Sequence, residues 1–449
     1  MRALFGNRTF RRLFAGRVVT NVGDSLYFVA AMWLVYDLTG DAFFSGLAGF
    51  LVMAPQSLQV FAGPLVDRWD LRRVLVGTQL VQGVVVLSLP VAAHVGWLSV
   101  WLVLTVMPLL SLLNQFVYPA QSAALPRIVD SEQLVEANSL FTLAYQGTDM
   151  IANAAGGVLV ALVGAVSLFA LDAVTFVVAA LLFVTISVPA AGAGNVGPES
   201  STGSDEAVGD DAVNDDGSAV PVADGGTTEG DAAGEDSKRD DDEGYLESLR
   251  EGVGFVRGTI LAPILLGATL VNFVASGATM GVLPAYADGL GGAGAYGLLL
   301  AAMAGGLFVG AMVASRLKAL PFGWLAIVGF VVSGTLWLAA VAVAWLPATA
   351  GLLALAFVPV GVSNVLLTTL VQSAVPDRLL GRVSGLLGTG SQAAVPVGAL
   401  LGGALASVLG PGLVLSSGGA GIVLLGVYWA SRPRLRTMAP VAEARTLAA

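Results

Sequence analysis

At Gly63-Pro64-Leu65-Val66-Asp67-Arg68-Trp69-Asp70-Leu71-Arg72-Arg73, a short charged segment interrupts an otherwise apolar part of the chain. The apolar stretches on its two sides cover residues 42–66 and 74–93. Each has about the roughly 20 residues that cross the hydrocarbon core of a bilayer as an α-helix. The charged segment is therefore predicted to be a turn at a membrane face.

The composition indicates a membrane protein. Of the 449 residues, 56% are hydrophobic and 12% are charged, and a water-soluble domain has too little interior for so much apolar surface. Arg8, Arg11 and Arg12 precede the first apolar run, which reaches Leu38 without a convincing small-residue cleavage site. That run is expected to be a spanning helix and not a removable signal peptide.

The hydropathy pattern predicts an all-α polytopic membrane protein with twelve transmembrane helices, six in each half. In the first half the predicted helices cover residues 13–38, 42–66, 74–93, 98–118, 138–163 and 167–188. In the second half they cover residues 261–287, 295–316, 322–345, 349–372, 383–408 and 412–430.

The positive charges support this count. All 21 Lys and Arg residues fall on one side of the membrane if the N-terminus is cytoplasmic, as the positive-inside rule requires. The opposite loops carry Asp37, Asp41 and Asp288, with Trp33, Trp97, Trp101 and Trp345 near them as an expected interfacial belt. Both termini are therefore predicted to be cytoplasmic, with the protein in the plasma membrane.

Residues 190–244 differ in composition from everything around them. They hold 16 acidic residues but only two basic ones, Lys238 and Arg239, so the formal charge of this segment is −14. The whole chain has a charge of −10, which means that the rest of the chain carries +4. Such a segment is expected to be a disordered cytoplasmic linker. Its acidity fits either a high-salt host or a partner-binding tail. Residues 245–260 have apolar residues at helical spacing, which predicts an amphipathic helix at the membrane face.

The two halves resemble each other at equivalent helix ends. The segment 121–127 after the fourth helix corresponds to 372–378 after the tenth, and this alignment places Asn114 opposite Asn364. The matches support two parallel six-helix bundles related by an axis along the membrane normal. The predicted division is 1–189 for the first bundle, 190–244 for the linker, 245–260 for the interfacial helix, 261–431 for the second bundle and 432–449 for the tail.

The charged turn at 63–73, with its pattern G-x-L-x-D-R-x-x-x-R-R, resembles the signature loop of the major facilitator superfamily. The resemblance implies a latch that locks the cytoplasmic helix ends in one transport state. By this resemblance the latch residues are Gly63, Asp67, Arg68, Arg72 and Arg73. The family commonly has Gly where this chain has Asp70 or Leu71. The alternative is a positive-inside loop with an incidental acid.

A second stretch narrows the resemblance. The sequence from Tyr118 to Pro126, with its P-A-x-x-A-x-x-P run, leads to an A-N-S-L entry at 137–140. This is similar to the branch of the superfamily that contains macrolide-efflux and siderophore-exporting permeases. Membership implies alternating access and suggests export.

A few polar residues within the apolar helices are candidates for ion coupling or substrate binding. Ionisable groups inside a membrane are costly unless they face a cavity. Burial also raises the pKa of a carboxyl group, so Asp24 and Asp149 could take up a proton in one facing state and release it in the other. The alternative for Asp24 is a pairing with Arg17, and Asp172 is expected to be hydrated near the outer surface. The amides expected on the pathway are those of Asn21, Asn272 and Asn364, with interhelical hydrogen bonding as their alternative role.

Other classes of chemistry find little support. The chain has no Cys and a single His, His94, which is expected at the surface where the third helix ends. No metal site, cofactor or nucleophile–base pair can be assembled from them, and the acidic linker does not suit nucleic acid. The chain is therefore not expected to be an enzyme.

The sequence thus predicts a monomeric secondary transporter that exports an amphipathic organic compound in exchange for protons, or for sodium. One alternative is an uptake carrier or facilitator for a small metabolite. Another is a membrane sensor or scaffold that does not transport and recruits a partner through the acidic linker.

Overall fold

The computed structural model describes residues 2–58, 69–186, 254, 259, 261–375, 383, 391–438 and 440. Three of the predicted latch residues, Gly63, Asp67 and Arg68, lie outside these ranges. The predicted linker 190–244 and almost all of the predicted interfacial helix 245–260 lie outside them too, so these expectations stay predictions.

The first half is helical throughout its described residues. Its elements are α1 (Arg2–Gly6), α2 (Arg8–Thr39), α3 (Ala42–Met53) with the 3₁₀ turn η1 (Ala54–Leu58), α5 (Leu71–His94), α6 (Val100–Asn114), α7 (Val117–Ile128), the 3₁₀ turn η2 (Ser131–Gln133), α8 (Leu134–Val163) and α9 (Ala165–Val184).

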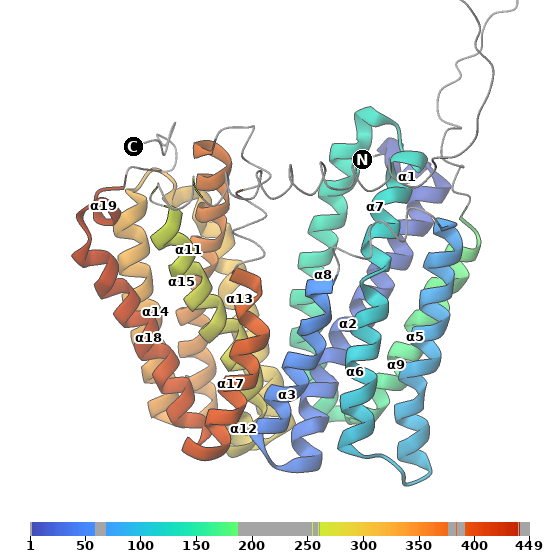
Figure 1. Ribbon diagram of the computed structural model, residues 1–449, viewed down its shortest axis with the longest axis horizontal. Helices are drawn as coiled ribbons and strands as arrows, with labels where there is room; N and C mark the ends of the chain where they lie inside the picture. The colour runs from blue at the N-terminus through green and yellow to red at the C-terminus, as the bar shows by residue number, and fades with distance from the viewer. Residues whose placement is uncertain are drawn as a thin grey trace, which may run out of the picture. The chain divides into compact units, whose positions relative to one another are not determined.

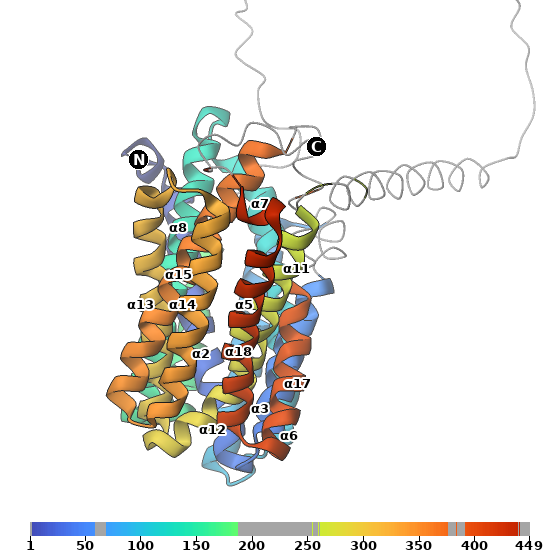
Figure 2. The same cartoon turned by 90° about the vertical axis from the view of Figure 1, so that its left-hand side faces the viewer.

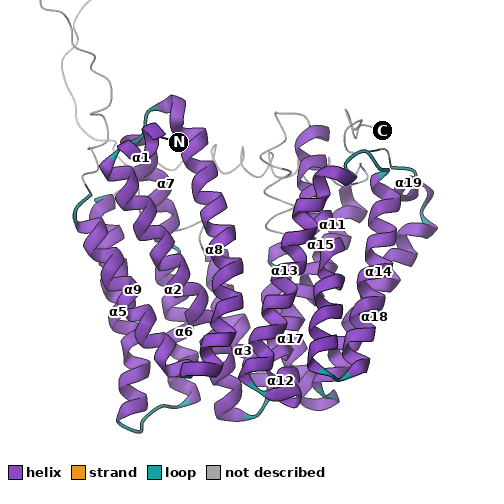
Figure 3. Ribbon diagram, turned by 180° about the vertical axis from the view of Figure 1, so that it is seen from behind, coloured by secondary structure: helices purple, strands orange, loops and turns teal. Residues whose placement is uncertain are grey.

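The second half repeats this plan. Its elements are α11 (Leu261–Val271), the π-helical segment η3 (Asn272–Ala278), α12 (Thr279–Gly291), α13 (Ala293–Leu317), α14 (Phe322–Val343), α15 (Leu346–Ala374), α17 (Ala394–Leu409), α18 (Pro411–Ser431) and the short α19 (Pro433–Arg436). Figure 3 shows helices and connecting loops in the described part of the chain.

Local sequence sets the helix starts. The side chains of Asn7, Asp41, Asp70 and Ser99 each accept hydrogen bonds from backbone N–H groups in the first turn of the helix that follows. Such capping satisfies donors that a helix N-terminus otherwise leaves free. Asp70 therefore has a specific role as the N-cap of α5.

The helices have the length and composition of membrane spans. Nine of the described helical segments are long and apolar enough to cross a bilayer, and two shorter apolar helices cover Ala42–Gln56 and Ala394–Leu409. The polar residues of α8, such as Asp149, make it less apolar than these. Together they occupy the positions predicted for twelve spans, which confirms the fold class.

Two predicted helices differ in detail. The fourth does not end at Tyr118 but bends after Asn114 and continues as α7, which contains the P-A-x-x-A-x-x-P run. Pro119 lies in the first turn of α7, where a missing N–H breaks no helical hydrogen bond. The seventh helix changes to π-helical geometry at Asn272 before it continues as α12.

The two six-helix halves belong to one compact unit, Met1–Val188 with Gly252–Ala449. Figure 1 shows α1 and α19 at the same end of it, and Figure 2 shows α3 and α12 at the opposite end. We call the opposite end, where α3 and α12 meet, the distal end.

The halves touch closely through glycines at the distal end. A Cβ built on Gly297 of α13 would overlap the backbone of Gly157 on α8. A Cβ on Gly46 of α3 would overlap Ala399 and Gly403 of α17 in the same way. Because no side chain separates these backbones, the halves approach each other more closely than side-chain packing would allow.

Aromatic and polar contacts join the halves at the same end. The Tyr36 hydroxyl on α2 donates to Asp288 Oδ2 on α12 over 3.3 Å, and the rings of Trp33 and Tyr296 lie 5.8 Å apart. Trp33 is only 8% exposed, so its expected place in an interfacial belt is wrong: it packs between the halves. Trp97, Trp101 and Trp345 are exposed as predicted.

Candidate functional site

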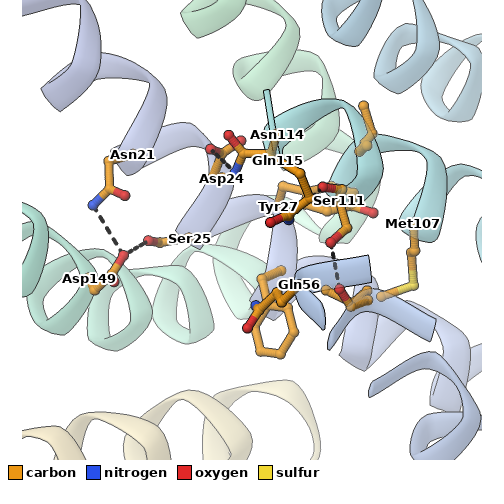
Figure 4. Close-up of a pocket in the computed structure, with 13 residues that line it drawn as sticks. Asn21, Asp24, Ser25, Tyr27, Gln56, Met107, Ser111, Asn114, Gln115 and Asp149 are labelled. Carbon is orange, nitrogen blue, oxygen red and sulfur yellow. Dashed lines mark hydrogen bonds between the residues drawn. The ribbon is translucent and has the colours of Figure 1, made fainter. Parts of the chain in front are cut away.

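A pocket of about 280 Å³ lies within the first half, and we call it the N-half pocket. Its size is close to the lower end of the range for small-molecule sites, about 300–1,000 Å³. Figure 4 shows polar side chains from α2, α6 and α8 turned toward one another around it. Its polar lining comprises Asn21, Asp24, Ser25, Tyr27, Gln56, Ser111, Asn114, Gln115 and Asp149.

Asp149 joins α8 to α2 at this pocket. Its Oδ1 atom accepts hydrogen bonds from Asn21 Nδ2 over 3.1 Å and from Ser25 Oγ over 2.6 Å. The residue as a whole is exposed, while its hydrogen bond with Ser25 is partly buried. Both donors lie on one face of α2 because they are four residues apart. The structure therefore brings together Asn21 and Asp149, which the sequence analysis named separately, and adds Ser25.

Asp24 lies on the same helix and lines the pocket from another side. Its Oδ2 atom accepts a hydrogen bond from Asn114 Nδ2 over 3.3 Å. Arg17 does not pair with it: the Arg17 Nε donates to Gln121 Oε1 and to Tyr145 Oη, each over 2.8 Å. The suggested Asp24–Arg17 ion pair is therefore absent from this structure.

Asp172 of α9 corrects an expectation. It was predicted to be hydrated, but it is 1% exposed because α2 covers it: a Cβ on Gly23 would overlap its Oδ1 and the hydroxyl of Thr175. Thr175 Oγ1 donates to that Oδ1 over 3.0 Å. Within the described residues neither Asp172 Oδ2 nor the buried Tyr27 hydroxyl has a hydrogen-bond partner. Asp172 thus lies inside the helix bundle and away from water.

The other two predicted amides lie in the second half. Asn272 and Asn364 line a smaller cavity of about 60 Å³, which we call the C-half pocket. Asn114 and Asn364, which the internal repeat aligned, thus line the pockets of their own halves.

Arg72 and Arg73 are the predicted latch residues that the structure describes. The Arg72 side chain donates to the carbonyl of Val184, and Arg12 Nη1 donates to the carbonyl of Thr185 over 2.8 Å. Both cations therefore stabilise the C-terminal end of α9, where the helix dipole is negative. The Arg73 backbone N–H donates to Asp70 Oδ1. These contacts stay within the first half and leave the latch itself a prediction.

The sequence reasoning missed several polar residues of the site. Ser25, Tyr27 and Tyr145 carry hydroxyl groups in otherwise apolar helices. A usable signal existed, because Asn21 and Ser25 on one helix, like Tyr145 and Asp149 on another, are four residues apart and so share a face.

A polytopic helical protein with two six-helix halves in contact, and with carboxyl groups lining a pocket at mid-helix, has the architecture of a secondary transporter. The chain matches the family model of the Major Facilitator Superfamily over residues 13–399. It therefore belongs to that superfamily and is a multi-pass membrane protein.

Two relatives illustrate its place in the family. The chain is 24% identical over 423 residues to the uncharacterized MFS-type transporter YvqJ of Bacillus subtilis, covering 94% of this chain and 91% of that protein. It is 26% identical over 188 residues to Macrolide efflux protein A of Streptococcus pyogenes, covering 41% of this chain and 45% of the relative. The predicted resemblance to macrolide-efflux permeases is thereby confirmed.

Solved structures share the fold. A bacterial homolog of the human lysosomal transporter Spinster, inward-facing and occupied, aligns with a TM-score of 0.62 at 14% identity, covering 93% of each chain. A bacterial homologue of the iron transporter ferroportin, in an inward-facing state, aligns with a TM-score of 0.60 at 15% identity, over 94% of this chain and 98% of that one.

Proposed function

We propose that this protein exports an amphipathic organic compound by alternating access, in exchange for protons. The observation that carries the proposal is the N-half pocket, in which Asp24 and Asp149 lie on facing helices and are both reachable from the same cavity. Ionisable groups in spanning helices usually mark ion or substrate pathways.

The hydrogen bonds of Asp149 suggest how a proton and a substrate could compete. In its charged form the carboxylate accepts from Asn21 and Ser25, and protonation would remove the charge that a cationic or polar substrate group can contact. Substrate binding that favours the charged form would release the proton, which is the linkage that an antiporter needs.

Alternating access would make and break the contacts between the halves at the distal end. The halves touch there through glycine backbones and through Tyr36 and Asp288. With cytoplasmic termini, this arrangement corresponds to a state that is closed on the outside. In the outward-open state these contacts would break, and the predicted latch at Asp67 would close the opposite end.

The direct test is proton release from purified protein in detergent when a macrolide, or the lipophilic cation tetraphenylphosphonium, is added. We expect wild-type protein to release protons and Asp149→Asn to release none, because Asn keeps the shape and an acceptor oxygen but cannot titrate. Asp24→Asn tests the second carboxyl group in the same way. Substrate binding without proton release in all three proteins would refute coupling through these acids and favour sodium coupling or facilitated uptake.

The acidic linker provides a test against a function that involves no transport. A neutral spacer in place of residues 190–244 is expected to leave transport unchanged. If the spacer variant loses a bound partner and the chain transports none of the probes even with its own linker, the membrane sensor or scaffold is favoured instead.

A further inference from the structure

We infer that the C-half pocket is a second ligand site, which binds a neutral ring-sized group carrying a hydrogen-bond acceptor. None of the twelve described residues that line it is ionisable, so a charged group would find no counter-ion among them. The site therefore differs in chemistry from the N-half pocket. This inference does not depend on proton coupling.

One of the residues that line the cavity carries a donor without a partner in the described part of the chain. Trp429 of α18 is 2% exposed, and its Nε1–H has no hydrogen-bond partner within the described residues. A buried donor without a partner costs free energy, which an acceptor on a ligand would recover. A carbonyl or ether oxygen is a suitable acceptor.

Aromatic rings surround this donor. The Phe330 ring lies edge-on to Trp429 with centroids 5.4 Å apart, and the Phe322 ring is 6.5 Å away. Aromatic walls favour a planar apolar group. Among the other lining residues Asn364 is exposed and Ser363 is half-buried, so the lining combines accessible polar groups with buried apolar ones.

The volume limits the size of the ligand group. A single water needs about 10–15 Å³ by this kind of measure, and the cavity has about 60 Å³. It therefore accommodates one ring or a short acyl group, but not a whole drug-sized molecule.

The backbone supplies an independent observation. Asn272, which lines the cavity, begins the π-helical segment Asn272–Ala278. Directly after this segment, Thr279 Oγ1 donates a hydrogen bond back to the carbonyl of Val274 over 2.9 Å. Single π-helical turns are rare and occur frequently at functional sites.

Fluorine NMR on the full-length protein, labelled with 5-fluorotryptophan, tests the inference. The chain has 8 Trp residues, and the Trp429→Phe variant assigns the relevant signal. We expect acetophenone, a ring with a carbonyl, to shift the Trp429 signal saturably. Toluene, which lacks the acceptor, should bind about fivefold more weakly, and benzoate should not bind because of its charge.

Equilibrium dialysis with acetophenone compares variants. Trp429→Phe should weaken binding about fivefold, whereas Trp324→Phe, an exposed Trp on α14, should not change it. Ser363→Leu narrows the cavity from another wall and should weaken binding even if Trp429→Phe fails to fold. Asp149→Asn should bind acetophenone like the wild type, which separates this site from the proton site.

Two results would overturn the inference. Equal affinity for acetophenone and toluene would mean that Trp429 recognises no acceptor. Equal shifts at all Trp signals, unchanged by Ser363→Leu, would mean that the probe only partitions into the detergent.

Discussion

The two halves of this transporter repeat one fold but hold opposite kinds of pocket. The N-half pocket has about 280 Å³ and two carboxyl groups, whereas the C-half pocket has about 60 Å³ and an aromatic lining without an ionisable group. The aligned residues Asn114 and Asn364 mark equivalent places in the two. The helical plan therefore recurs in the two halves, while the side chains of the two pockets differ.

This difference suggests a division of labour. The carboxyl groups of Asp24 and Asp149 lie on α2 and α8, so the proposed uptake of a proton there would change the electrostatic potential of the first half. The C-half pocket of the second half offers an apolar surface of defined shape, and the contribution of such a surface to ligand binding does not vary with pH. An amphipathic compound has one end suited to each kind of pocket.

The largest effect is expected from moving the carboxyl group. Asp149→Asn should abolish substrate-stimulated proton release, and adding Asn364→Asp in the second half should not restore it. Within the described residues no side chain donates a hydrogen bond to the Asn364 side chain, as Asn21 and Ser25 do to Asp149, so a new carboxyl group there would not be tied to the α2–α8 contact. Proton release measured on the single and double variants checks this, and recovery in the double variant would break the comparison.

A second variant tests whether the halves separate at the distal end. Gly297→Leu cannot keep the contact with Gly157, because even a Cβ would overlap that backbone. A Cys reporter at the buried Ala295 is convenient because the chain has no Cys of its own. We expect the reporter to react with an impermeant maleimide about tenfold faster, which corresponds to a shift of about 1.4 kcal/mol between states.

The matched control is Gly305→Leu on the same helix, where an added Cβ has nothing within 4 Å. It should label at the wild-type rate. Equal acceleration in both variants would point to general loosening of α13 instead of separation of the halves.

The smallest effect concerns two arginine–tyrosine pairs. Arg17 lies 5.2 Å from the centre of the Tyr145 ring in the first half, and Arg432 lies 5.0 Å from that of Tyr428 in the second. Tyr145→Phe removes a hydrogen bond to a buried cation and should destabilise by about 1.5–3 kcal/mol. Tyr428→Phe on the surface should cost less than about 0.5 kcal/mol. Thermal unfolding of both variants in detergent ranks them, and equal losses would contradict the contrast.

Much of the fold follows from the sequence because the membrane imposes simple rules. Long apolar runs must form helices there. The number of spans can be checked because the Arg residues must all fall on one side of the membrane. Asp149 was predictable for the same reason: a carboxyl group in an apolar helix has few possible roles. Its partner Ser25 was not, because that contact depends on how α2 packs against α8.

The errors share one cause, which is that position along a helix does not reveal the neighbours of a residue. Asp172 looked hydrated from its place near a helix end, yet Gly23 brings α2 directly over it. Trp33 looked like an interfacial residue, but it is buried by other helices. The π-helical turn at Asn272 has no signature that hydropathy detects.

The paired glycines at the distal end have a kinetic consequence. Side chains that interlock must leave their grooves before two helices can move past each other, and each such step adds to the activation barrier. Gly157 and Gly297 present smooth backbone to each other, so α8 and α13 can roll with little steric resistance. We therefore expect the speed of interconversion between the two facing states to be set mainly by the breaking of polar contacts, such as that between Tyr36 and Asp288, and only weakly by helix packing.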